Sequence, residues 1–164
     1  MSGQSDADRV WDIIEKVGVC MLTTHSSGGL RARPLEARPD RKAGIICFVT
    51  DLYSGKEREI EIEQDVGLTF IDPGDRAYLS LPARAHLALD RALAARIWRG
   101  TDNAWWTGPD DPNVCVLKVE PLTAELWDGP ASKAATMFEL VKARLTEAAP
   151  EVGENRKITV DMQH

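Results

Sequence analysis

The stretch FVTDLYSGKEREI, residues 48–60, runs an apolar strand directly into the polar start of a helix. Ser54 and Glu57 have the spacing of a capping box, which predicts a helix that begins near Gly55. The free N–H groups and the dipole of a helix start favour an anion, and Lys56 adds a positive charge in the first turn. We therefore interpret this junction as a phosphate site, with a surface lysine on a capped helix as the alternative.

The segments before this helix show the hydrophobic alternation and the turn residues of antiparallel strands. We expect strands at residues 17–24, 30–37 and 45–50, with turns at SSGG, residues 26–29, and from Pro39 to Gly44. A first helix is expected from Ser5 to about Lys16, because Ser5 and Asp8 have capping-box spacing and the apolar residues that follow share one face. This helix should cover a barrel end or a sheet edge.

The segments after the central stretch continue the antiparallel pattern. We expect strands at residues 66–72, 77–89, 114–120, 122–128 and 157–160, a helix from Asp90 to about Arg99, and a C-terminal helix at about 130–149. Most connections are too short for a crossover helix, which disfavours parallel winding. We expect six or seven of these strands to be joined mostly by hairpins, and the predicted fold class is α+β, a mostly antiparallel six-stranded β-barrel with flanking helices. We expect a single domain over residues 1–164, with its core at about 11–128.

The composition restricts the classes of partner. The chain has 164 residues, a formal net charge of -6 and a pI near 5.1, which argue against nucleic acid or an anionic membrane as the main partner. No run approaches the roughly 18 apolar residues of a membrane helix, and the N-terminus lacks a basic start, so we expect a cytoplasmic location. Three cysteines without a C-x-x-C pair and three histidines without H-E-x-x-H spacing predict buried thiols and no protein-bound metal.

Five pieces of the chain, taken in order, have the sequence and spacing of a known family. They are LRARPLE at 30–36, FVTDLYSGKEREI at 48–60, LDRALAARIW at 89–98, AWWTGPDDPNVCVLKVEP at 104–121 and ELWD at 125–128. Together they resemble the pyridoxamine 5′-phosphate oxidase-like split-barrel flavoproteins, and within them the general stress protein 26 group. The resemblance implies an FMN-binding split β-barrel and a homodimer with the flavin at the subunit interface.

The resemblance also implies a set of cofactor-binding residues. In that family the FMN phosphate is held by an arginine on the second strand, a threonine that ends the third, and a Ser/Lys pair that opens the next helix. By position these are Arg33, Thr50, Ser54 and Lys56. The planar fork of Arg33 and the point charge of Lys56 suit a phosphate. Arg31 shares a strand face with Arg33 under period-two alternation, with an exposed rim arginine as its alternative role.

Three further residues are assigned to the flavin ring. Pro34 and Leu35 correspond to the family segment whose backbone runs along the ring. Trp105 and Trp106 lie in a polar loop, and we assign Trp106 to the wall of the flavin ring or of the substrate space across the interface. The alternative is that the two tryptophans plug the core or the dimer interface.

Two departures from the family pattern bear on activity. Where relatives often show S-x-S-G-x-A, this chain has Ser80-Leu81-Pro82-Ala83-Arg84-Ala85, and a proline in mid-strand implies a sheet edge or a bulge. The C-terminal signature that true pyridoxamine 5′-phosphate oxidases use for cofactor and substrate is not visible. Oxidation of vitamin B6 phosphates is therefore not expected.

The expected function is an FMN-dependent oxidoreductase that acts on a small molecule, with a small-molecule or nicotinamide electron donor. In such chemistry the flavin performs the redox step, and no side-chain catalytic set is identified. Two alternatives stay open: a non-catalytic flavin-binding stress or sensor protein, and a split barrel that binds another cofactor, such as a deazaflavin or haem.

Overall fold

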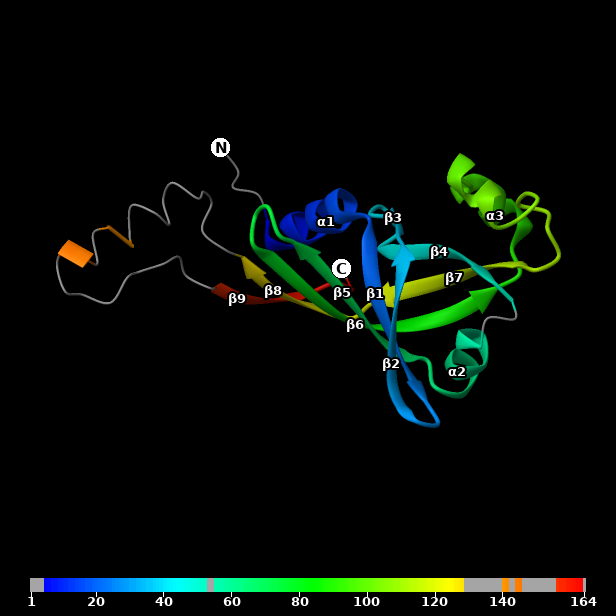
Figure 1. Cartoon of the computed structure of the whole chain (residues 1–164), viewed down its shortest axis with the longest axis horizontal. Coiled ribbons are helices and arrows are strands. Elements are labelled where there is room, and N and C mark those ends of the chain that lie inside the picture. Colours follow the sequence, from blue (N-terminus) through cyan, green and yellow to red (C-terminus); the bar gives the residue numbers. More distant parts are fainter. Residues whose placement is uncertain (1–4, 53–54, 129–139, 142–143, 146–155, 164) are drawn as a thin grey trace.

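Strands with alternating buried and exposed residues form one curled antiparallel sheet (Figure 1). The structure, a computed structural model, describes residues 5–52, 55–128, 140–141, 144–145 and 156–163. In this part of the chain the strands are β1 Val19–Ser26, β2 Gly29–Glu36, β3 Arg38–Asp40, β4 Ile45–Asp51, β5 Asp65–Asp72, β6 Ala77–Ala88, β7 Val114–Pro121, β8 Thr123–Asp128 and β9 Arg156–Asp161. The helices with described bounds are α1 Asp6–Val17, α2 Lys56–Ile62, α3 Arg91–Ile97 and the 3-10 helix η1 Gly100–Ala104.

The sheet curls into a half-barrel. Its hydrogen-bonded order is β2-β1-β5-β6-β7-β4-β3, and β8 pairs with both β6 and β9. β2, at one end of this path, also contacts β4 near the other end. All strand pairs among the described residues are antiparallel, so the predicted α+β split barrel with a mostly antiparallel sheet is confirmed.

One strand was not expected from the sequence. The residues Pro39 to Gly44 predicted a turn, but Arg38–Asp40 form β3, which pairs with β4. Pro39 is tolerated there because β3 is the last strand of the sheet path, and edge strands accommodate proline. Arg38 is buried and donates a hydrogen bond to Asp102 of η1 at 2.8 Å, so β3 also anchors the segment after α3.

The inner face of the sheet holds the larger hydrophobic core, and α1 covers part of it. Ile13 and Ile14 of this helix are both 0% exposed. The helix starts as predicted, because Ser5 is its N-cap and accepts a hydrogen bond from the Asp8 N–H at 3.1 Å. It ends at Gly18, whose φ of 72° lies in the left-handed region that favours glycine.

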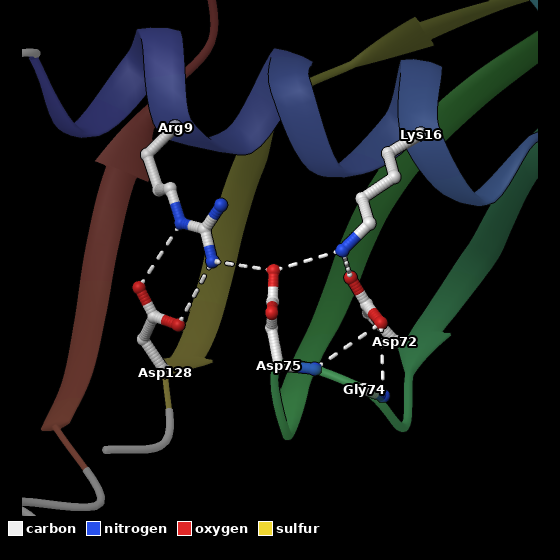
Figure 2. A network of polar contacts seen from close by, with 6 residues as sticks. All are labelled: Arg9, Lys16, Asp72, Gly74, Asp75 and Asp128. Carbon is white, nitrogen blue, oxygen red and sulfur yellow. Dashed lines mark hydrogen bonds and ion pairs between the residues drawn. The ribbon is translucent and has the colours of Figure 1, made fainter. Parts of the chain in front are cut away.

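Ion pairs hold α1 against the ends of the strands (Figure 2). Arg9 donates two hydrogen bonds of 3.1 Å to Asp128, at the end of β8. The Lys16 ammonium lies 2.6 Å from a carboxylate oxygen of Asp72 and 2.9 Å from one of Asp75. Lys16, together with N–H groups of the turn that follows β5, holds the pKa of Asp72 below its ordinary value. Helix α1 is therefore tied to the sheet by charge as well as by its apolar face.

A smaller hydrophobic cluster lies on the outer face of β4 and β7, beneath α3. Its buried members are Cys47, Val49, Leu93, Ala94, Val114 and Val116. Trp98 and Trp106 pack against it, with ring centroids 6.1 Å apart and planes tilted by 60°. The three cysteines of the chain are buried, as predicted, and burial raises the pKa of Cys20 to about 12.

Pro82 lies in the middle of β6, which is not an edge strand. On one side β6 pairs with β5, where Gly67 is opposite Pro82. On the other side β6 pairs with β8 at residues 78–80 and with β7 at residues 83–88, so Pro82 falls between two partners. Its carbonyl accepts a hydrogen bond from the Leu122 N–H, in the connection between β7 and β8, at 2.9 Å. The N–H that proline lacks would also point to the place where the partner of β6 changes from β8 to β7, so no ladder hydrogen bond is lost there.

The C-terminal part of the prediction is described only in pieces. Of the helix expected at about 130–149, residues 140–141 and 144–145 are described, as helix, while the strand expected at 157–160 is confirmed as β9. No helix within the described ranges is long and apolar enough to cross a membrane. The same ranges contain no group of three or more His, Cys, Asp or Glu side chains arranged to hold a metal ion.

Candidate functional site

Two arginines lie on the inner face of β2. In the β1–β2 ladder Leu22 is opposite Arg33 and Thr24 is opposite Arg31, and directly opposed residues share one face of a sheet. Leu22 and Thr24 are both 0% exposed, which identifies this face as the inner one. The predicted shared face of Arg31 and Arg33 is therefore confirmed.

Arg33 belongs to a closed triangle of hydrogen bonds with Thr24 and Glu59. Its Nη2 donates to Glu59 Oε2 at 2.8 Å, and its Nη1 donates to Thr24 Oγ1 at 3.0 Å. The Thr24 hydroxyl in turn donates to Glu59 Oε2 at 2.5 Å. Arg31 adds a longer bond to Glu59 Oε1, at 3.3 Å. Side chains from β1, β2 and α2 thus meet at one carboxylate.

The Glu59 carboxylate is shielded and held in its ionised form. Its side chain is 13% exposed. The hydrogen bond from Thr24, followed by the interactions with Arg33 and Arg31, lowers the pKa of Glu59 below its ordinary value. Two guanidinium charges against one carboxylate leave the cluster positive. The cluster can therefore attract a further anion although both arginines already have a partner.

Thr50 lies at the end of β4, on the strand that borders the arginines. It is 2% exposed, and alternation along β4 places it on the same face as Phe48, a member of the inner core. Because β2 contacts β4, the strand that carries Thr50 runs next to the strand that carries Arg33. The assignment of Thr50 to the phosphate, together with Arg33, stays a prediction.

The start of α2 differs in detail from the prediction. The helix begins at Lys56, but its N-cap is Gly55, with a φ of 82° and no capping side chain. The predicted capping box of Ser54 and Glu57 is therefore wrong by one residue, because the third helical residue after Gly55 is Arg58. Ser54 and the side chain of Lys56 lie outside the described residues, so their assignment to the phosphate stays a prediction.

A cavity of about 780 Å³ opens beside the arginine cluster, between the β1–β2 hairpin and α2. It is lined by residues 25–28 and Arg31 on the hairpin, and by Gly55, Arg58, Glu59, Ile62 and Glu63 on the α2 side. Its volume is within the range of about 300 to 1,000 Å³ that is typical of small-molecule sites. A ligand in this cavity would have both Arg31 and Glu59 at its wall.

The sequence matches the family described as pyridoxamine 5'-phosphate oxidase like over residues 5–151, which is most of the chain. The chain belongs to this family. General stress protein 26 of Bacillus subtilis (strain 168) is 28% identical over 145 residues, which cover 85% of this chain and 100% of that protein. Protein bli-3 of Neurospora crassa is 23% identical over 151 residues, which cover 85% of this chain and 72% of that protein.

Solved structures of similar proteins share the fold. A candidate general stress protein 26 from Jannaschia sp. CCS1 has a TM-score of 0.76 and 28% sequence identity, and the match covers 93% of this chain and 95% of that chain. The general stress FMN/FAD binding protein of Xanthomonas citri has a TM-score of 0.68 and 24% identity, over 76% of this chain and 89% of that chain. The resemblance to the general stress protein 26 group is thereby confirmed.

In this pyridoxamine 5′-phosphate oxidase-like chain, the residues assigned to the flavin ring lie on both faces of the sheet. Trp106 packs on Trp98 over the outer cluster of β4 and β7. Leu35 packs against the inner core, and Pro34 is exposed on the other face of β2. Within one chain, therefore, Trp106 and Arg33 belong to opposite faces of the sheet, and a role of Trp106 across an interface stays a prediction.

Sequence reasoning missed two members of the cluster, Thr24 and Glu59. They are 35 residues apart, and no short-range motif joins them. A partial signal was present, because the turn at 26–29 fixes the hairpin register and so places a threonine opposite an arginine. Glu59 also lies three residues after Lys56, on one side of the same helix.

Proposed function

We propose that this protein binds FMN through its phosphate group at the junction of β2, β4 and α2, with Arg33, Thr50, Ser54 and Lys56 as ligands. The placement of Arg33 carries the proposal: its side chain is 20% exposed and is fixed by two hydrogen bonds on the strand that borders β4. A fixed, partly buried guanidinium is suited to bidentate recognition of phosphate. Family membership supports the proposal, and the Xanthomonas citri relative is named as FMN/FAD binding.

The donor set fits a phosphate monoester in charge. Arg31, Arg33 and Lys56 carry three positive charges, and Glu59 carries one negative charge, which leaves two positive charges. A phosphate monoester carries about −1.5 to −2 charges near neutral pH. The site would therefore be close to neutral with FMN bound, which lowers the cost of removing the phosphate from water.

Bound FMN would supply the redox chemistry of an oxidoreductase, with a small molecule or a nicotinamide as electron donor. The chain's own residues would bind and orient the cofactor. Pro34 and Leu35 directly follow Arg33 in β2, so a phosphate held by Arg33 brings their backbone next to the rest of the cofactor. This agrees with the assignment of the two residues to the flavin ring.

The proposal includes a second copy of the chain. Trp105 is 79% exposed, and further large apolar side chains are exposed on β1, β5 and β6. These are Val19, Met21, Ile71 and Tyr78. Ile71 is directly opposite Tyr78, on the face of the sheet that also carries Met21, and an apolar surface of this kind is typical of protein interfaces. We therefore propose a homodimer with the flavin at its interface, in which Trp106 of one subunit walls the flavin held by the other.

The visible spectrum of freshly purified protein tests the cofactor assignment. The maxima of oxidised flavin are expected, and a Soret band or the spectrum of a deazaflavin would contradict FMN. Anaerobic addition of NADH or NADPH then tests turnover. An oxidoreductase with a nicotinamide donor should bleach the flavin rapidly, whereas a flavin-binding stress protein without turnover should leave it oxidised.

A further inference from the structure

We infer that Thr24 and Glu59 are positioning residues, which hold Arg33 so that one defined edge of its guanidinium faces the phosphate. The inference rests on the proposed function, because it adds to the phosphate site two residues that are not among its predicted ligands. It assigns to them no contact with the ligand itself.

A guanidinium has two edges that can each bind an oxyanion through two N–H groups. The end edge, Nη1 and Nη2, is occupied in Arg33, because Nη1 donates to Thr24 and Nη2 donates to Glu59. The side edge consists of Nε and the second hydrogen of Nη2. Arg33 Nε has no hydrogen-bond partner within the described residues, so this edge is available to a ligand.

The triangle of hydrogen bonds fixes the Arg33 side chain to a rigid part of the sheet. Thr24 is 0% exposed and lies on β1, which pairs with β2 on one side and β5 on the other. Its hydroxyl accepts from Arg33 and donates to Glu59, and the bond between Arg33 and Glu59 closes the ring. A side chain that is already fixed loses less conformational freedom when a ligand binds. The two residues should therefore raise the affinity for phosphate without touching it.

A carboxylate beside an arginine has a second conceivable role, as a competitor of the phosphate. Glu59 would then weaken the binding of an anion by repulsion. Substitution of Thr24 distinguishes the two roles. Its hydroxyl carries no charge and cannot repel an anion, but it bonds to both Arg33 and Glu59. Arg31 gives no such distinction, since it is 64% exposed and its bond to Glu59 is 3.3 Å long.

Thr24→Val and Glu59→Asp test the inference, because both change the geometry and neither changes the formal charge. Valine keeps the shape of threonine but removes both hydrogen bonds of the hydroxyl. Aspartate keeps the carboxylate but is one methylene shorter. FMN and riboflavin are titrated into each flavin-free protein by fluorescence quenching, and the ratio of the two dissociation constants isolates the phosphate. Both variants should reduce the preference for FMN by about threefold to tenfold and leave riboflavin unaffected.

Thr23→Val is the matched control. Thr23 is the next residue in β1, faces the other side of the sheet, and makes no side-chain hydrogen bond within the described ranges. It should leave the preference for FMN unchanged. A second readout follows Arg33 directly. Nitrogen-15 NMR relaxation of its Nε–H group in the flavin-free protein should show greater side-chain mobility in Thr24→Val and Glu59→Asp, but not in Thr23→Val.

The outcomes separate the inference from the proposed function. If the wild type prefers FMN, and Thr24→Val and Glu59→Asp behave like Thr23→Val, only the inference is wrong. Tighter binding of FMN by Glu59→Asp would identify Glu59 as a competitor and overturn the inference as well. If the wild type binds FMN and riboflavin equally, the proposed phosphate site is wrong, and the inference falls with it. Thermal melts check that each variant is folded. If Thr24→Val, at a buried position, does not fold, Glu59→Asp, at a partly exposed position, is used to test the inference.

Discussion

Single side chains show where sequence reasoning reaches its limit in this protein. Arg31 and Arg33 could be predicted to share a face, because side chains along a strand alternate with a period of two. Their common partner could not be predicted, since Glu59 lies 28 and 26 residues further along the chain, beyond the two strands β3 and β4. Only the folded sheet, with α2 packed against β1, brings the carboxylate to the two guanidinium groups.

Substitution of the predicted phosphate ligands should affect FMN and spare riboflavin. Each charge-assisted hydrogen bond to phosphate contributes roughly 1.5 to 3 kcal/mol, so Arg33→Ala and Lys56→Ala should each weaken FMN about tenfold to a hundredfold. Fluorescence titration with both flavins measures the effect. Arg84→Ala is a suitable control, because Arg84 is 60% exposed and pairs only loosely with Asp65, at 3.5 Å. Equal losses for FMN and riboflavin would instead indicate damage to the fold.

Among the secondary-structure elements, those with local signals were predicted best. Helix α1 has its cap, its apolar face and its terminal glycine within one short segment. The cap and the apolar face were predicted, and the glycine lies where local rules place the end of a helix. Strand β3 was missed because Pro39 and Asp40 are typical turn residues, and only pairing with β4 makes them a strand. The proline of β6 was noticed, but its position between two partner strands depends on the whole sheet.

The attachment of α1 should weaken in acid. Lys16 and the turn N–H groups lower the pKa of Asp72 in the folded protein. The ionised Asp72 therefore stabilises the fold fully above pH 3.8, the ordinary pKa of an aspartate, and this stabilisation is lost as the pH falls through the lower pKa of the folded state. Asp72→Asn should therefore have a lower melting temperature than the wild type at pH 7, and the difference should shrink towards pH 3. Asp65→Asn, at an exposed carboxylate on the other end of β5, is the control. A difference that stays constant over this range would argue against the ion pair.

For the molecule as a whole, hairpin signals and alternation predicted a mostly antiparallel barrel, and the resemblance of five ordered sequence pieces to a known family predicted the split barrel. The surface of the barrel was harder to predict. Exposure of Met21, Ile71 and Tyr78 on three different strands follows only from the way the sheet curls. A contact with a second copy, furthermore, leaves no pattern within a single sequence that separates it from ordinary surface.

The protein should be a dimer in solution. A permanent interface that covers the exposed apolar side chains and encloses the flavin would bury on the order of 2,000 Å² or more. Light scattering coupled to size-exclusion chromatography measures the mass directly, against 18.1 kDa for one chain. A flavin-loaded monomer at micromolar concentration would exclude an interfacial site.

Oxidation of pyridoxine or pyridoxamine phosphate should be slow or absent. The substrate signature of the true oxidases is not seen in the sequence after Trp127. A steady-state assay with saturating FMN measures the rate, and turnover of about 1 per second or faster, ordinary for an enzyme, would show that this signature is dispensable.

The position of Pro82 has a consequence for how the folded protein opens. Within the described part of the chain, the β8–β9 ribbon pairs with β6 only along residues 78–80, and the proline ends that ladder where β7 takes over. Although Leu126 of β8 is buried in the core and Arg9 of α1 holds Asp128, this short ladder leads us to expect that the ribbon opens before the barrel, so that the two parts have different opening free energies. In native-state hydrogen exchange, the amides of β8 should exchange faster than those of β7, and exchange at equal rates would mean that the chain opens only as a whole.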